Sequence, residues 1–178
     1  MSYAGKDFAS SFRTVRKNTI QIAEDIPESN YAFSPAPDVR TVGQMLTHIA
    51  LSTRIFEELN KDHRLTTLVG LDFVGFRERQ AADEAKPRTK ADILELLRAE
   101  GDRFSSWLES VTPEILAEEV TDADGKTVRT RFERLLAAKE HEMHHRAQLM
   151  LIERQLGIVP HTTRQMNERL AQMHTAKA

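Results

Sequence analysis

Apolar residues recur at alternating steps of four and three over four long segments, which is the period of an amphipathic α-helix. These segments cover residues 8–26, 41–59, 89–111 and 130–156. Pro27 ends the first segment, while Thr41 and Thr130, each followed three residues later by Gln or Glu, predict capping boxes. Gly157 is typical of the residue that follows a helix C-terminus. The pattern predicts an all-α fold, a four-helix bundle.

Two connections are expected to be more than simple turns. Residues 61–88 are too long for a tight turn, so they predict a long elaborated crossover between helices 2 and 3 that contains a short helix. Thr112 and Pro113 are typical of the start of another brief helical turn. The pair Asp124-Gly125 predicts a short hairpin before the last long helix.

The chain is long enough to bury a core and short enough to be one domain. We expect residues 1–160 to form the bundle and residues 161–178 to form a C-terminal tail helix, part of the same domain. The tail carries Met166, Leu170 and Met173 at helical spacing. We expect these side chains to pack onto the bundle, although a seam between two copies is the alternative.

Composition narrows the classes of function. The 25 Lys and Arg against 27 Asp and Glu give a formal net charge of −2, which does not favour nucleic acid as a partner. There is no cysteine, which excludes disulfides and thiol nucleophiles, so any metal would be held by His, Asp or Glu. The sequence shows neither a signal peptide nor a membrane span. We therefore expect a cytoplasmic protein with a small-molecule substrate.

Histidines gather in the stretch KEHEMHHRAQLMLIERQLG of the last long helix. On a helical wheel His141 lies about 40° from His145, and both fall within the apolar stripe that includes Leu149. His144 is rotated about 100° away, toward the edge of the stripe. Two histidines four residues apart suit chelation, because both rings project from one face. By themselves they fit metal ligands and hydrogen-bonded core residues equally well.

A metal would need a further ligand from another helix, and His48 on the second helix is the best candidate. A lone histidine there is more often a packed residue, but the inward pair His141 and His145 requires a partner. Three neutral imidazoles would leave one position of a divalent cation open, as in catalytic sites. Zinc, nickel and iron(II) all suit this ligand set.

Gln148 and the remaining histidines have other predicted roles. Gln148 is predicted either to orient a histidine ring or to make a polar contact between helices. His161 could cap a helix or reach the mouth of the site, with a surface position favoured. His63 and His174 are expected to be solvated.

The same letters contain a competing motif, because His141, Glu142 and His145 form His-Glu-x-x-His. In zinc proteases the two histidines bind the metal and the glutamate activates water. Glu168 would then be the third ligand. This alternative is less favoured, because it leaves His48 unused and the chain has no strand-rich part to bind an extended peptide.

The segments PAPDVRTVGQMLTHIA around His48 and HEMHHRAQLMLIERQLGIVP from His141 resemble the DinB-like (YfiT-related) superfamily of metal-binding helical bundles. The resemblance covers essentially the whole chain. Ala147 stands where the family usually has glycine, a change that does not involve a candidate ligand. The resemblance implies that His48, His141 and His145 bind a divalent metal, and that homodimers are frequent among such proteins, so a homodimer is a possible state of this one.

The resemblance also implies a range of activities, including isomerases and S-transferases that use a low-molecular-weight thiol such as bacillithiol or mycothiol. We therefore expect a metal-dependent enzyme, either a thiol S-transferase or a small-molecule hydrolase, with zinc or nickel ahead of iron. The alternatives are a non-catalytic bundle, in which Glu142 or His161 completes the coordination, and the zinc hydrolase described above.

Overall fold

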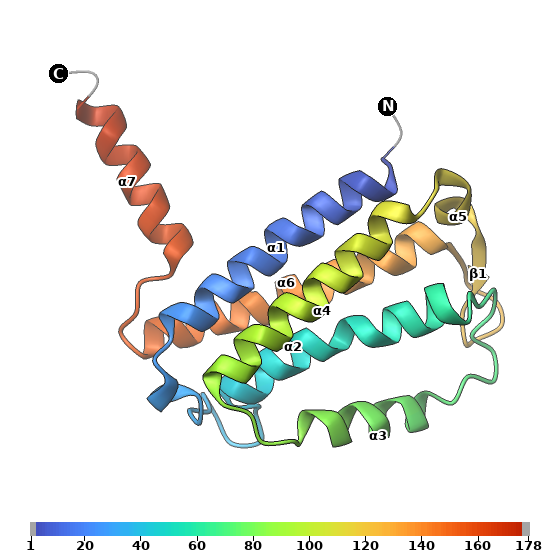
Figure 1. Ribbon diagram of the computed structural model, residues 1–178, viewed down its shortest axis with the longest axis horizontal. Helices are drawn as coiled ribbons and strands as arrows, with labels where there is room; N and C mark the ends of the chain where they lie inside the picture. Colours follow the sequence, from blue (N-terminus) through green and yellow to red (C-terminus); the bar gives the residue numbers. More distant parts are fainter. Residues whose placement is uncertain (1–2, 176–178) are drawn as a thin grey trace.

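The computed structural model describes residues 3–175, so the end of the expected tail, residues 176–178, lies outside them. Figure 1 shows the bundle, whose four long helices are α1 Gly5–Asp25, α2 Val42–Glu57, α4 Lys90–Ser110 and α6 Arg131–Gln155. Helices α1 and α2 each pack against both α4 and α6. The two consecutive helices α1 and α2 therefore occupy opposite corners. The predicted all-α four-helix bundle is confirmed.

Local sequence sets where these helices begin and end. Thr41, Thr89 and Thr130 each accept a hydrogen bond from the backbone N–H three residues later, and the side chain of that residue bonds back. These capping boxes satisfy N–H groups that have no partner within the helix. Helix α1 ends at the residue before Ile26 and Pro27. Beyond α6, Gly157 has a φ of 77°, in the left-handed region that glycine adopts without strain.

The connections contain the remaining elements. The first is a 3₁₀ turn, and the second is a π turn that continues α2: Glu28–Asn30 and Glu58–Asp62. Helix α3, Phe73–Glu84, is the short helix predicted in the crossover, and it runs alongside α2 (Figure 1). After α5, Pro113–Ala117, strands β1 and β2 pair antiparallel: Glu119–Thr121 and Val128–Thr130. The predicted hairpin is therefore confirmed.

The core has two apolar halves with a polar layer between them. One half contains side chains such as Ile22, Leu46, Leu97 and Leu149. The other contains Phe8, Phe12, Phe104, Leu108 and Leu135. Along α1 and α6, Arg16 and Glu142 fall between these two sets, and both are almost completely buried. Gly101 of α4 leaves room for them, because a Cβ there would lie 2.7 Å from Cγ of Arg16.

The buried pair makes a dense set of hydrogen bonds. Nε and Nη2 of Arg16 donate to the Glu142 carboxylate at 3.0 Å, and its Nη1 donates to the carbonyl of Leu97 at 2.7 Å. The Thr19 hydroxyl donates to the same carboxylate at 2.7 Å. A buried charge is tolerated when it is paired and fully hydrogen-bonded, and this one links α1, α4 and α6.

Helix α7, His161–Thr175, corrects one expectation. Figure 1 shows it extending away from the bundle, and only its beginning is close to α1. Met166, Leu170 and Met173 are 54%, 48% and 59% exposed, so the prediction that they pack onto the bundle is wrong. The four long helices already enclose the core, and the turn from Gly157 to Pro160 directs α7 outward.

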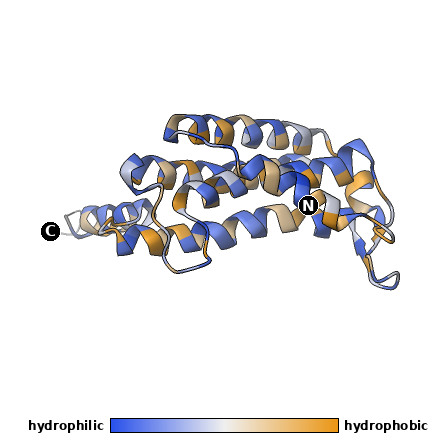
Figure 2. Ribbon diagram, turned by 90° about the horizontal axis from the view of Figure 1, so that it is seen from below, coloured by the Kyte–Doolittle hydropathy of each residue, from blue (hydrophilic) through white to orange (hydrophobic). Residues whose placement is uncertain are grey.

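Polar and apolar residues are mixed along each helix. In Figure 2 hydrophilic residues predominate along the helices, and hydrophobic residues recur between them at short intervals. Among residues 3–175, none of the helices combines the length and the apolar character needed to cross a lipid bilayer.

Candidate metal centre

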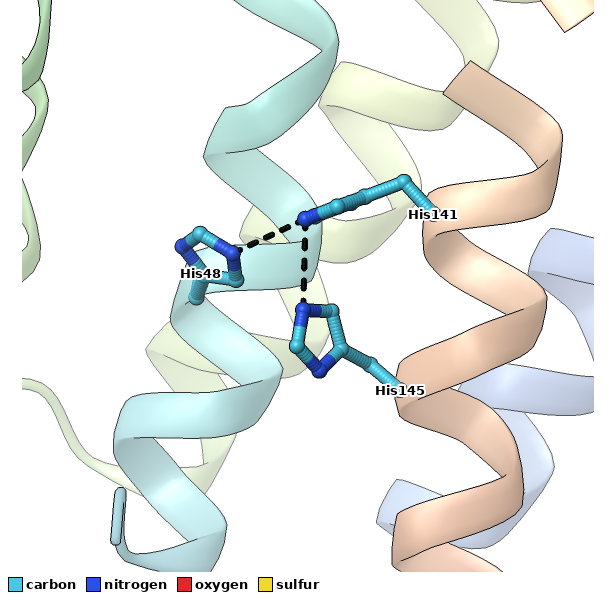
Figure 3. A group of neighbouring side chains, drawn as sticks. All are labelled: His48, His141 and His145. Atoms are coloured by element: carbon cyan, nitrogen blue, oxygen red, sulfur yellow. Dashed lines mark hydrogen bonds between the residues drawn. The ribbon is translucent and has the colours of Figure 1, made fainter. Parts of the chain in front are cut away.

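Three histidine rings from two helices point toward one another. His48 comes from α2, and His141 and His145 come from successive turns of α6 (Figure 3). Nε2 of His141 lies 3.0 Å from Nε2 of His48 and 3.2 Å from Nε2 of His145. The structure therefore brings together all three histidines that the sequence singled out. Within the described part of the chain they form the group of potential ligands whose atoms lie within 4.8 Å of one another.

The spacing of these nitrogens fits a divalent cation. Zinc binds imidazole nitrogen at about 2.0–2.1 Å with tetrahedral geometry, which places two ligand nitrogens roughly 3.3 Å apart. The two separations that involve His141 Nε2, 3.0 and 3.2 Å, are close to that value. A cation could therefore be accommodated with small movements of the rings.

The outer nitrogens indicate which ring atoms carry protons. Nδ1 of His48 lies 2.6 Å from Oε1 of Glu84, and Nδ1 of His145 lies 2.8 Å from Oε1 of Gln148. Since these oxygens are acceptors, each Nδ1 donates, and in the neutral ring Nε2 is left with a lone pair. Both lone pairs face Nε2 of His141, which has at most one proton to donate. Hydrogen bonds alone therefore leave two nitrogen lone pairs facing each other without a proton between them, whereas a cation would accept all three lone pairs.

Burial and neighbouring charges keep the imidazoles of His141 and His145 in the neutral form. Burial, together with the charges of the neighbouring His145 and His48, lowers the pKa of His141 to about 4. Burial likewise lowers the pKa of His145, although its hydrogen bond with Gln148 opposes that effect. Both rings are therefore neutral at pH 7, and neutral imidazole is the ligand form.

Glu84 is a part of the site that sequence reasoning missed. It comes from the end of α3, and it also accepts a hydrogen bond from Nε2 of Gln80 at 2.8 Å. Burial disfavours its charged form, but the contact with His48 and the charge of Arg40 outweigh this and hold its pKa below the ordinary value. A carboxylate bound to the outer nitrogen of a histidine fixes the ring and makes it a stronger ligand. The polar residues of the crossover gave no sign of this position.

The other histidines are not among the three converging rings, although His144 is next to His145. His144 accepts a hydrogen bond from Nε2 of Gln148 at 3.2 Å, so this amide bridges His144 and His145. Of the two roles predicted for Gln148, the orientation of a ring is the one observed. His161 is buried rather than on the surface, with Nε2 3.2 Å from Oδ1 of Asn18. As expected, His63 and His174 are exposed.

The glutamate of the His-Glu-x-x-His motif faces away from the rings. Glu142 is only 1% exposed, and its carboxylate is engaged by Arg16 and Thr19. Glu168 lies on the exposed part of α7, on the helix that leaves the bundle. Neither residue is in position for the role that a zinc protease would need. The same contacts, with those of His161, argue against a coordination shell completed by Glu142 or His161.

A cavity of about 540 Å³ borders the histidine cluster on the side of His145. It is open to solvent and is lined by residues of α2, α3, α6 and the loop that precedes α2. Glu84 and Gln148, which orient two of the rings, also line it. Its volume is within the range of small-molecule sites.

The molecule is a four-helix bundle in which three half-buried imidazoles converge. This arrangement defines a class of helical proteins suited to binding a divalent cation. The chain belongs to the DinB superfamily, whose family model matches residues 11–149. It is 27% identical to the uncharacterized protein YjoA of Bacillus subtilis over 150 residues, which are 83% of this chain and 88% of that one.

Solved structures share the fold. The crystal structure of the DinB-like YjoA from Bacillus subtilis has a TM-score of 0.62 at 24% identity, covering 84% of this chain and 90% of that one. YfiT from the same organism, described as a probable metal-dependent hydrolase with an unusual four-helix bundle topology, has a TM-score of 0.67 at 17% identity, covering 89% and 90%. The mycothiol-dependent maleylpyruvate isomerase has a TM-score of 0.62 at 12% identity, covering 79% and 58%.

Proposed function

We propose that this protein is a metal-dependent enzyme that transfers a low-molecular-weight thiol to a small electrophilic substrate. Nε2 of His48, His141 and His145 would hold a divalent cation, with zinc or nickel ahead of iron(II). The observation that carries the proposal is the convergence of the three Nε2 atoms, while Nδ1 of His48 and Nδ1 of His145 each lie next to an acceptor oxygen. A cation satisfies that arrangement, and hydrogen bonds do not.

The donor set supports catalysis rather than a purely structural role. Three neutral nitrogen ligands leave a position open on a four-coordinate cation. A cation held there would lower the pKa of a bound thiol, whose thiolate form is the reactive one. Glu84 and Gln148 keep the rings of His48 and His145 in position. The adjacent cavity provides room for the thiol and its acceptor.

In such a transfer the thiol sulfur forms a bond to an electrophilic carbon of the substrate. The leaving group departs with the electron pair of its bond, and the thiol proton passes to solvent. This chemistry needs no general base from the protein, and Glu142 is unavailable as one because Arg16 and Thr19 occupy its carboxylate. The thiol dependence of the mycothiol-dependent isomerase, which shares the fold, also supports this version.

A small-molecule hydrolase is the second candidate, because Asp38 lines the cavity and could assist a water molecule. The description of YfiT as a probable metal-dependent hydrolase supports it. Incubation of the zinc-loaded protein with an activated ester separates the two versions. Ester cleavage that is independent of added thiol favours hydrolysis, whereas product formation that requires thiol favours transfer.

Cobalt(II) titration followed by visible absorption tests the metal site. We expect one equivalent to bind to the wild-type protein and binding to be lost in His48→Ala, His141→Ala and His145→Ala. Glu84→Ala should weaken binding about ten-fold, because the ring of His48 loses its orienting carboxylate.

His63→Ala is the matched control, since His63 is exposed and should leave the titration unchanged. If the three cluster variants bind cobalt as well as wild type does, the assignment of the ligands is wrong. If metal binds as expected but thiol neither alters the cobalt spectrum nor reacts with an alkylating substrate in the zinc form, the thiol version is wrong.

A further inference from the structure

The cavity beside the histidine cluster contains a single guanidinium, that of Arg40. Arg40 is the residue immediately before the N-cap of α2, and its side chain is 43% exposed. Among the side chains that line the cavity it is the one with a permanent positive charge, as far as the described residues go. It lies close enough to the histidines that its charge contributes to the lowered pKa of both His141 and His145.

The backbone that carries Arg40 is held on both sides. The hydroxyl of Ser34 donates to the carbonyl of Ala36 at 2.7 Å and to that of Val39 at 2.9 Å. On the other side, the N–H of Val42 donates to the carbonyl of Phe33 at 3.0 Å. The guanidinium is therefore presented from a fixed point at the edge of the cavity, rather than from a loose loop.

The hydrogen-bonding capacity of Arg40 is unused. Its nearest acidic partner is Glu84, whose Oε2 lies 3.6 Å from Nη2, beyond hydrogen-bond distance. Within residues 3–175 the guanidinium donates no hydrogen bond, and the other carboxylate oxygen of Glu84 serves His48 and Gln80. Arginine presents its N–H groups in a planar fork that matches a carboxylate.

We propose that Arg40 binds a carboxylate of the small molecule that occupies this cavity, so that the ligand carries a metal-binding atom at one end and a carboxylate at the other. This inference rests on the proposed metal site. The charges of the cavity favour a monoanion over a phosphate dianion, because Asp38 and Glu84 also line it and only one guanidinium opposes them. Val39 and Met45 leave apolar surface for the carbon chain between the two ends.

A pair of thiols tests the proposal. 3-Mercaptopropionate and 3-mercapto-1-propanol have the same chain length and differ in the carboxylate. Each is titrated into the cobalt-loaded protein and followed by the sulfur-to-cobalt charge-transfer absorption. We expect wild type to bind the acid at least about ten-fold more tightly than the alcohol, the size of effect that a charge-assisted hydrogen bond gives.

Arg40→Gln should bind the two thiols equally, and Arg40→Lys should retain part of the preference. Arg79→Gln is the matched control, because it removes the same charge from α3, where Arg79 pairs with Glu58 outside this cavity. It should keep the full preference. No preference in wild type, or a preference that survives in Arg40→Gln because the carboxylate binds the cation instead, would overturn the proposal.

A second readout does not depend on the metal. The Nε–H signal of Arg40 in the NMR spectrum of metal-free protein, assigned by its absence in Arg40→Gln, should shift on addition of 3-mercaptopropionate and not of the alcohol. Absence of that shift contradicts the carboxylate subsite. Failure of cobalt to bind contradicts the proposed function alone, and the NMR result then still decides whether Arg40 binds the carboxylate.

Discussion

Each imidazole of the cluster is oriented in a different way. The ring of His48 is fixed by a carboxylate from α3, and the ring of His145 is fixed by an amide one turn along its own helix. The ring of His141 is held between the other two, and it is also the ring whose pKa is lowered to about 4. The contact that orients His145 therefore lies within one helix, whereas the contact that orients His48 joins two helices that are distant in sequence.

A second titratable residue, Glu153, is buried away from this cluster. It is fully buried near the end of α6, and neither carboxylate oxygen has a hydrogen-bond partner among the described residues. Burial and the charge of Asp25 raise its pKa to about 7, although Arg164 and Arg154 oppose the shift. In the unfolded chain the pKa would be near 4.5.

We predict that Glu153→Met stabilises the protein at pH 8 and has little effect at pH 4.5. At pH 4.5 the carboxyl group is neutral in the folded state and only half ionised in the unfolded chain, so the difference is small, whereas above about 7 the folded state bears the full cost of a buried charge. The advantage of the variant should grow between these pH values and reach about 3 kcal/mol. Urea unfolding of both proteins with chelator present measures the difference.

Glu168→Met is the control for this substitution, because Glu168 is exposed on α7 and should give no such pH-dependent difference. An equal stability difference between wild type and Glu153→Met at pH 4.5 and pH 8 would contradict the assignment of a raised pKa to Glu153.

At the scale of elements, α6 has functional side chains on two faces. His141 and His145 face α2, and Glu142 faces α1, where Arg16 holds it. A rotation of α6 that carried the rings away from His48 would also pull the carboxylate of Glu142 from its guanidinium. The buried ion pair therefore fixes the rotational setting of the helix that supplies two of the three candidate ligands.

We predict that Glu142→Leu lowers the free energy of unfolding by about 3 kcal/mol, because it leaves the charge of Arg16 buried without its partner. The double variant Arg16→Met with Glu142→Leu should recover most of that loss, since two apolar side chains replace two charges. Urea unfolding in the presence of chelator measures both.

Arg13→Met is the matched control. Arg13 lies on α1, as Arg16 does, and forms an exposed ion pair with Glu109 of α4, so the substitution should change stability by less than about 1 kcal/mol. A double variant less stable than Glu142→Leu would show that the two charges act independently of each other.

Local features of these helices could be predicted from the sequence, but contacts between distant segments could not. Helix spacing and capping residues such as Thr41 and Thr130 were sufficient for the long helices, because these signals are local. A wheel centred on one stripe placed His141 and His145 inward but could not show that Glu142 is buried even more deeply, because α6 packs against both α1 and α2. Glu84 was missed because its position depends on how the crossover docks, which is a long-range property.

At the scale of the whole molecule, α7 is the element least integrated into the bundle. Its first turns are tied to α1 by the ion pair of Arg164 and Asp25 at 2.6 Å. Beyond them Met166, Leu170 and Met173 form an exposed apolar stripe. An apolar stripe on a helix that leaves its own domain is available to a second copy of the chain.

We predict that the protein is a dimer and that Met166→Glu with Leu170→Glu makes it monomeric, because four like charges would then face one another across a two-fold seam. Analytical ultracentrifugation measures the mass. Gln165→Glu with Asn167→Glu adds the same charge at exposed polar positions of α7 and should leave the dimer intact. A wild-type protein that sediments as a monomer would contradict the prediction.

The distance along the chain between the two helices of the histidine cluster has a consequence for biosynthesis. His48 and His141 are 93 residues apart. During translation His48 therefore emerges from the ribosome well before the helix that carries the other two rings. The cluster is complete only after that helix docks, so the proposed cation would be bound late in the maturation of the chain.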